Sequence, residues 1–140
     1  MNIKIISNIS KLNTAHDGCI KEYGKRLSRY CKFSFISLKK EKELSKYISP
    51  NVSYIFVTPS KHTISSEELA TNINQLGISG KSDVTFLVGF SDKKWLDDFN
   101  ATYTSISISP LSLSTGLTAA VLAEQIYRAY RIIKGEPYHK

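Results

Sequence analysis

Short runs of apolar and β-branched residues recur along this 140-residue chain, each bounded by polar or turn-forming residues. The five runs are Ile3 to Ile9, Phe33 to Leu38, Ser53 to Val57, Val84 to Val88 and Tyr103 to Ser109. Runs of this length and composition predict β-strands. The third and fourth runs are almost continuously apolar, which is typical of strands buried on both faces of a parallel sheet.

The segments between these runs carry apolar residues at spacings of three and four, as on one face of a helix. We expect helices from Asn13 to Tyr30, from Ser65 or Ser66 to Gly77, and from Ser114 or Thr115 to Gly135, with weaker helical turns at 40–47 and 91–99. The last helix is the clearest, and its apolar stripe consists of Leu122, Ile126, Ala129 and Ile133. The glycine after it, followed closely by a proline, predicts its end.

Strands alternating with helices predict an α/β fold, with a mostly parallel sheet flanked by helices. The length suits a single domain spanning residues 1–140, and no repeat, linker or low-complexity tract divides it. Hydrophobic residues make up 41% of the chain, and no apolar run approaches the roughly 20 residues needed to cross a membrane. The start lacks a signal-peptide pattern, and Cys19 and Cys31 are the only cysteines. We therefore expect a reduced, cytoplasmic protein.

The formal net charge is +7, from 19 Lys and Arg against 12 Asp and Glu. This balance favours a polyanionic partner such as RNA, because a cation placed at a phosphate releases counterions. A generally basic, soluble surface has the same composition. Charge alone therefore does not choose between the two interpretations.

Three loops are candidates for ligand binding, because ligands in open parallel sheets bind beyond the carboxyl ends of the strands. They follow Val57, Val88 and the run that begins at Tyr103. In the second, Gly89 lacks a Cβ and lets backbone approach a ligand, although most such glycines only turn the chain. In the third, serines alternate with isoleucines and leucines. That alternation favours an ordinary edge strand, and the alternative is an irregular loop whose backbone binds a polar ligand.

The chain ends with a segment rich in reactive side chains, Glu-Pro-Tyr-His-Lys, after the predicted helix stop. Pro137 stiffens this segment, and Tyr138 offers a stacking surface and a hydroxyl. His139 carries an imidazole, the side chain suited to moving a proton at neutral pH. Chain ends are usually disordered, but rigid and aromatic residues after a helix stop indicate a docked segment. None of the three histidines has metal-ligand spacing, so no metal site is expected.

The residues from Ala123 to the end, AEQIYRAYRIIKGEPYHK, closely resemble the C-terminal signature of the ribosomal RNA large-subunit methyltransferase H family. Its members are small SPOUT methyltransferases whose signature is roughly EQ-[LIV]-[YF]-RA, a helix turn, and a final YH with a basic residue. Three upstream segments resemble other parts of the family: EYGKRLSRYCKF, YIFVTPSKHTISSEELA and SDVTFLVGFSD. The resemblance covers nearly the whole chain, with a shorter stretch between Leu38 and Ser53. The EQxYRA…YHK signature is its most specific part.

This resemblance implies a trefoil knot in the C-terminal half, a homodimer, and S-adenosylmethionine bound in the knot. It also implies methyl transfer to N3 of a pseudouridine in 23S ribosomal RNA, with the assembled ribosome as substrate. By matching segments, the cofactor-binding residues are Val57, Gly89, Ile108, Ser109, Pro110, Leu111, Ser112 and Leu113. These positions fall in the three candidate loops.

The resemblance further implies that Tyr138 and His139 close the site, with His139 handling the N3 proton and Tyr138 positioning the base. Arg128, Lys140 and the basic first helix would hold the RNA backbone. A cofactor site near a dimer interface would let the tail or helix of one subunit serve the RNA bound by the other.

The chain departs from the family pattern at several positions. Phe90 stands where a second glycine is usual, Thr115 replaces a histidine and Ala119 replaces an arginine. A phenylalanine at position 90 would crowd an adenosine pocket, and the other two changes remove polar or cationic contacts. The alternative function is therefore a catalytically weak or inactive relative that still binds RNA or ribosomes.

Overall fold

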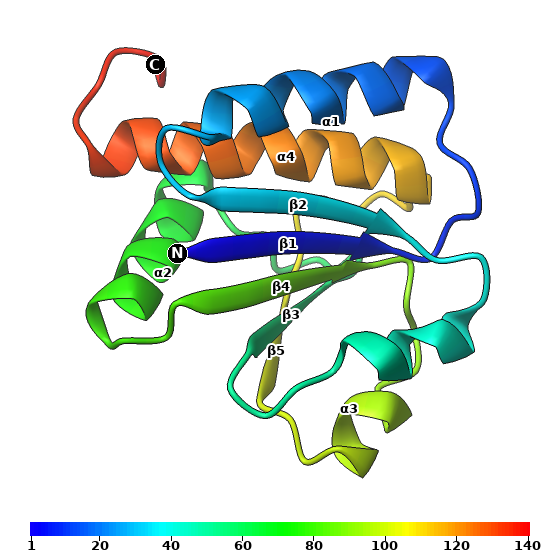
Figure 1. Ribbon diagram of the computed structural model, residues 1–140. Helices are drawn as coiled ribbons and strands as arrows, with labels where there is room; N and C mark the ends of the chain where they lie inside the picture. The colour runs from blue at the N-terminus through cyan, green and yellow to red at the C-terminus, as the bar shows by residue number, and fades with distance from the viewer.

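The parallel sheet predicted from the apolar runs is confirmed by the computed structural model, which describes residues 1–140. Its strands are β1 (Asn2–Ser7), β2 (Lys32–Ser37), β3 (Ser53–Val57), β4 (Asp83–Val88) and β5 (Tyr103–Ile106). They lie in the order β2-β1-β4-β3-β5, and every neighbouring pair is parallel. All carboxyl ends therefore lie at one edge of the sheet (Figure 1).

Helices cover the two faces of the sheet unequally. The long helices are α1 (Thr14–Leu27), α2 (Ser66–Ile78) and α4 (Thr115–Ile133), and the short ones are the 3-10 helix η1 (Glu41–Tyr47) and α3 (Lys94–Asp98). The long helices bury one face in a core of 20 residues that includes Ile5, Phe86 and Ile126. On the other face η1 and α3 contribute Leu44 and Leu96 to a second core of 8 residues. Figure 1 shows α1 and α4 side by side over the sheet.

Serine side chains cap two of the long helices at the positions where the sequence predicts that these helices begin. Ser65 caps α2 and forms a capping box with Glu68: the Glu68 amide donates to Ser65 Oγ at 3.0 Å, and the Ser65 amide donates to Glu68 Oε2 at 2.9 Å. Ser114 caps α4 by accepting a hydrogen bond from the Leu117 amide at 3.3 Å. Gly135 follows the helix with a φ of 64°, a left-handed conformation that glycine adopts at little cost.

The expectation that the fifth strand continues to Ser109 is wrong, because β5 ends at Ile106. Beyond it the serine side chains bond to the local backbone, which competes with strand pairing. Ser107 Oγ donates to the Ser109 carbonyl at 2.9 Å, and Ser109 Oγ accepts from the Leu111 amide at 2.9 Å. The segment before α4 is therefore the irregular loop that the sequence left as an alternative.

None of the helices combines the length and the hydrophobicity that a membrane-spanning helix requires.

Phe86 in the middle of β4 is fully buried in the larger core, so Phe86→Ala should destabilise the fold by about 3–5 kcal/mol. Ile78→Ala is the control, because that side chain is 78% exposed and its loss should change the stability by less than about 0.5 kcal/mol. Urea unfolding followed by circular dichroism measures both. Similar midpoints for the two variants would contradict the assignment of this core.

Candidate functional site

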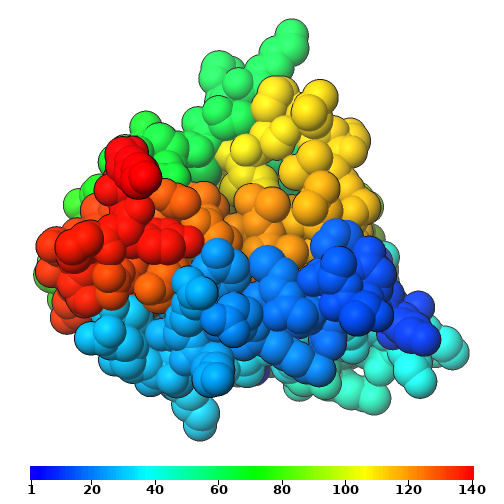
Figure 2. Space-filling view, turned by 90° about the horizontal axis from the view of Figure 1, so that it is seen from above, coloured from blue at the N-terminus to red at the C-terminus, as the bar shows by residue number.

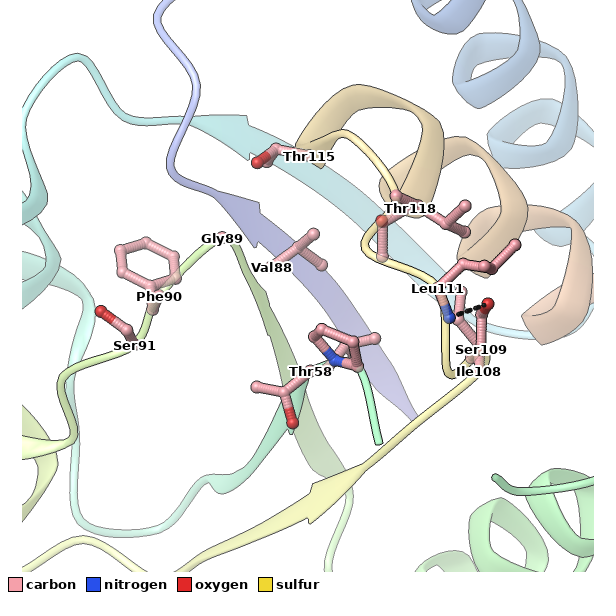
Figure 3. A pocket seen from close by; sticks show the side chains of 13 residues that line it. Thr58, Val88, Gly89, Phe90, Ser91, Ile108, Ser109, Leu111, Thr115 and Thr118 are labelled. Carbon is pink, nitrogen blue, oxygen red and sulfur yellow. Dashed lines mark hydrogen bonds between the residues drawn. The ribbon is translucent and has the colours of Figure 1, made fainter. Parts of the chain in front are cut away.

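A cavity of about 430 Å³ lies at the carboxyl edge of the sheet. It is lined by Val57, Thr58, Pro59, Val88, Gly89, Phe90, Ser91, Ile108, Ser109, Leu111, Leu113, Thr115 and Thr118. These residues come from the ends of β3 and β4, the loop after β5 and the first turn of α4 (Figure 3). The three loops selected from the sequence therefore converge on one site.

Most of the predicted cofactor residues line this cavity. Those that do are Val57, Gly89, Ile108, Ser109, Leu111 and Leu113, whereas Pro110 and Ser112 do not. Sequence reasoning missed Thr115 and Thr118, which face the strand ends from the start of α4. Thr115 stands at the position of a histidine in the family pattern, but no motif links either threonine to the cavity, because only the return of the chain to the sheet edge brings them there.

Gly89 leaves little space for a side chain at the site. Its φ is 85°, and a Cβ there would lie 2.9 Å from Thr115 Cγ2. Asn8, which follows β1, secures the turn: its Nδ2 donates to the Gly89 carbonyl at 3.2 Å and its amide donates to the Val88 carbonyl at 2.9 Å. Sequence reasoning missed Asn8, although a polar residue after the strand that neighbours β4 is a usable signal.

The substituted family positions have specific surroundings. Phe90 is 3% exposed and belongs to the second core, on the sheet face opposite α4. In Figure 3 its ring points away from the loop that carries Ser109 and Leu111. Phe90 nevertheless lines the cavity, so the expectation that it crowds an adenosine pocket stays a prediction. Ala119 is fully buried in the larger core, where the charge of an arginine would lose its hydration.

The cavity holds no titratable side chain among the residues that line it. Apolar groups, hydroxyls and backbone surround the space. Such a lining can bind a mostly apolar ligand with a few polar edges. It cannot supply a general acid or base from these residues, so any proton transfer needs a group from elsewhere.

The C-terminal tail is docked, as the sequence predicts, but at the far end of α4. Arg131 holds it: Nη1 donates to Glu136 Oε2 at 2.7 Å and Nη2 donates to the Pro137 carbonyl at 2.6 Å. The 19 residues of α4 span about 28 Å, and neither Tyr138 nor His139 lines the cavity. The expectation that the tail closes the site is therefore not met within one chain, because the straight helix separates the two regions.

Tyr138 lies in a partly buried aromatic environment. Its hydroxyl donates to Glu124 Oε1 at 3.0 Å and lies 3.3 Å from the Tyr23 hydroxyl. Its ring packs edge-on against Tyr127, with centroids 4.9 Å apart. Burial raises the pKa of Tyr138, and the neighbouring Tyr23 and Glu124 raise it further. The phenol is therefore a hydrogen-bond donor at neutral pH.

His139 lies between a carboxylate and a guanidinium. Its Nε2 is 2.7 Å from Glu67 Oε1, and its Nδ1 is 3.2 Å from Arg128 Nη1. The hydrogen bond from His139 is the main cause that lowers the pKa of Glu67. Arg128 is also bonded to Glu124, at 2.6 Å through Nη2. The guanidinium of Arg128 already has these partners within the chain, whereas Lys140 is exposed. Contacts of both residues with RNA stay predictions.

No group of three or more His, Cys, Asp and Glu side chains is placed to hold a metal ion.

Gly89→Ala should destabilise the protein more than Gly80→Ala. Both glycines have a positive φ, so each substitution costs about 1–2 kcal/mol of backbone strain. A Cβ at Gly80 meets nothing within 4 Å, whereas at Gly89 it meets Thr115. Thermal unfolding of the two variants isolates this contact, and equal losses would contradict the close packing at the cavity.

Comparison with known proteins identifies the family of the chain. Residues 1–139 match the family model described as "Predicted SPOUT methyltransferase". The chain is 40% identical over 140 residues to the ribosomal RNA large subunit methyltransferase H 1 of Thermoanaerobacter sp. (strain X514), with 100% of both chains covered. It is 37% identical over 160 residues to the ribosomal RNA large subunit methyltransferase H of Clostridium novyi (strain NT), again with 100% of both covered. The chain therefore belongs to the SPOUT methyltransferase family.

Proposed function

We propose that the protein is an S-adenosylmethionine-dependent methyltransferase that modifies N3 of a pseudouridine in 23S ribosomal RNA of the ribosome. The observation that carries this proposal is the convergence of Val57, Gly89 and the 108–113 loop on one cavity, although they are far apart in the chain. The relatives named as ribosomal RNA large subunit methyltransferases support the class of substrate. A ribosomal substrate also favours a cytoplasmic location.

The residues of the cavity fit S-adenosylmethionine. A volume of about 430 Å³ lies in the range usual for small-molecule sites. Leu111, Leu113 and Ile108 offer apolar contacts to an adenine ring, and Gly89 leaves its backbone accessible. When bound, the cofactor supplies a methyl group already activated on a sulfonium sulfur, which keeps the electron pair of the broken bond.

The chain must therefore orient the base and manage the N3 proton. No titratable side chain lines the cavity, and we assign these tasks to the tail because the family resemblance implies that its residues close the site. His139 is the candidate for handling the proton, and Tyr138 is the candidate for positioning the base. Lys140 and the basic side of α1 lie exposed and suit contacts with the RNA backbone.

A homodimer would bring the tail of one subunit to the cavity of the other. Leu111 and Leu117, at the cavity end of α4, are 69% and 38% exposed. Figure 2 shows the surface of α4 between α1 and the loop before α4, with the tail at the opposite end. Antiparallel pairing of two α4 helices about a twofold axis would place the partner's tail beside the cavity and cover both leucines.

A knot in the C-terminal half is part of the same proposal. The segment after β3 runs beside the segment after β5: the Thr58 amide donates to the Ile106 carbonyl at 3.0 Å, and the Ile64 amide donates to the Ser107 carbonyl at 2.8 Å. After this contact α2 packs against α4. Passage of the chain before α4 through the loop at 58–65 would form the knot, and tracing an experimental structure there tests it.

The function is tested by calorimetric titration with S-adenosylmethionine and by transfer of labelled methyl groups to ribosomes that lack the modification. We expect saturable binding and incorporation at one nucleotide. Gly89→Val should weaken binding, because a side chain would occupy the cavity wall beside Thr115. Binding without incorporation would indicate the alternative, a relative that binds RNA without modifying it, and absence of both would refute the proposal.

Sharing of the tail between subunits is tested by mixing two inactive variants, Gly89→Val and a deletion of residues 138–140. Each lacks a different part of the site. If tails act across the dimer, random mixing should restore about a quarter of the unaltered activity, since half of the dimers are hybrids with one complete site. If each tail serves its own cavity, the mixture stays inactive. The control is the activity of each variant alone, measured at the same total protein concentration.

A further inference from the structure

The signature residues Glu124 and Arg128 lie under the tail and not at the cavity. They are four residues apart on α4, with side chains 18% and 25% exposed, and their ion pair is 2.6 Å long. This pair differs from the Glu22–Arg26 pair of α1, which has the same spacing but side chains 52% and 44% exposed. The pair on α4 is thus shielded by the tail that it contacts.

Glu124 collects donors from the tail and from its own helix. Its Oε1 accepts from the Tyr138 hydroxyl at 3.0 Å and from Arg128 Nε and Nη2 at 3.1 and 2.6 Å. Its Oε2 accepts from Gln125 Nε2 at 2.7 Å. The Arg128 guanidinium also lies 4.9 Å from the centre of the Tyr138 ring. The carboxylate therefore fixes Tyr138 directly and fixes the plane of the guanidinium.

The fixed guanidinium determines the tautomer of His139. Guanidinium nitrogens donate and never accept, so His139 Nδ1, 3.2 Å from Arg128 Nη1, must be the acceptor. In a neutral ring the proton then lies on Nε2, which donates to Glu67 Oε1 at 2.7 Å. A proton added at Nδ1 would face the positive charge of Arg128.

The two edges of the imidazole also differ in exposure. The Nδ1 edge faces the shielded pair on α4, whereas the Nε2 edge faces Glu67, whose side chain is 63% exposed. A bond to an exposed carboxylate is weak and easily exchanged. The Nε2–H is therefore the group that a nucleobase could take over from Glu67.

We propose that Glu124 and Arg128 are positioning residues that hold His139 as the neutral Nε2–H tautomer, so that His139 donates a hydrogen bond to a carbonyl oxygen of the base. This inference rests on the proposed function, and it changes the role of His139 from handling the N3 proton to donating a hydrogen bond. As N3 loses its proton to water, negative charge spreads onto the neighbouring oxygens, and a fixed donor stabilises that charge. The N3–methyl bond then forms without proton transfer to His139.

The tautomer of His139 is measured without substrate, so the result does not depend on methyl transfer. Long-range ¹H–¹⁵N spectra of histidine-labelled protein at neutral pH should show His139 with its proton on Nε2 alone, the signal being assigned by its loss in His139→Gln. Arg128→Ala should introduce the Nδ1–H form. Glu22→Gln, which alters the matched pair on α1, should leave the His139 signals unchanged. A wild-type His139 ring with its proton on Nδ1 would overturn the inference. This result decides the matter even if the Arg128→Ala variant does not fold.

Substitution of His139 separates a donor from a base. His139→Ala should lower the turnover about 100-fold with unchanged cofactor affinity, whereas His139→Gln, which keeps an N–H donor, should stay within about tenfold of the unaltered enzyme. Equal losses in both variants would refute the donor role. An unaltered enzyme that transfers no methyl group would refute the proposed function and leave the spectroscopic result standing.

Discussion

Parallel pairing of the five strands is the constraint on which the rest of the molecule depends. Because each strand runs in the same direction, the loops after β3, β4 and β5 leave the sheet at the same edge. Backbone that would be scattered in an antiparallel arrangement therefore surrounds a single space. The cavity is a consequence of the topology, and its lining needs no reactive side chain to form.

The straight helix α4 divides the chemistry of the molecule into two regions. Its first turn supplies Thr115 and Thr118 to the cavity, and its last turns hold the docked tail. The binding surface is built from backbone, hydroxyls and apolar groups, whereas the carboxylates of Glu124 and Glu67 lie beside Tyr138 and His139. In the proposed dimer the helix acts as a spacer of fixed length that sets where each tail meets the other subunit.

The three residues that depart from the family pattern lie in different surroundings. Phe90 enters the second core, where Leu87 and Leu96 surround it with other apolar side chains. Ala119 lies in the larger core between α4 and the sheet. Thr115 takes a place in the wall of the cavity and limits the space at Gly89. Phe90 and Thr115 therefore both line the candidate site, whereas Ala119 does not.

By itself the sequence determined the α/β class, the strands, the long helices and their caps. Hydrophobic periodicity and capping residues such as Ser65 and Ser114 act over a few neighbours and can be read directly from the chain. It also identified the three loops at the cavity, because the ends of parallel strands share one edge.

Tertiary structure alone decided where β5 ends, what surrounds Phe90 and where the tail lies. The alternating serines beyond Ile106 match a strand in pattern, but their hydroxyls bond to the local backbone and the loop after β3 occupies the neighbouring position. His139 meets Glu67 across 72 residues of sequence, a contact that no local pattern encodes. Such contacts depend on the length and direction of packed helices, which exist only once the whole chain has folded.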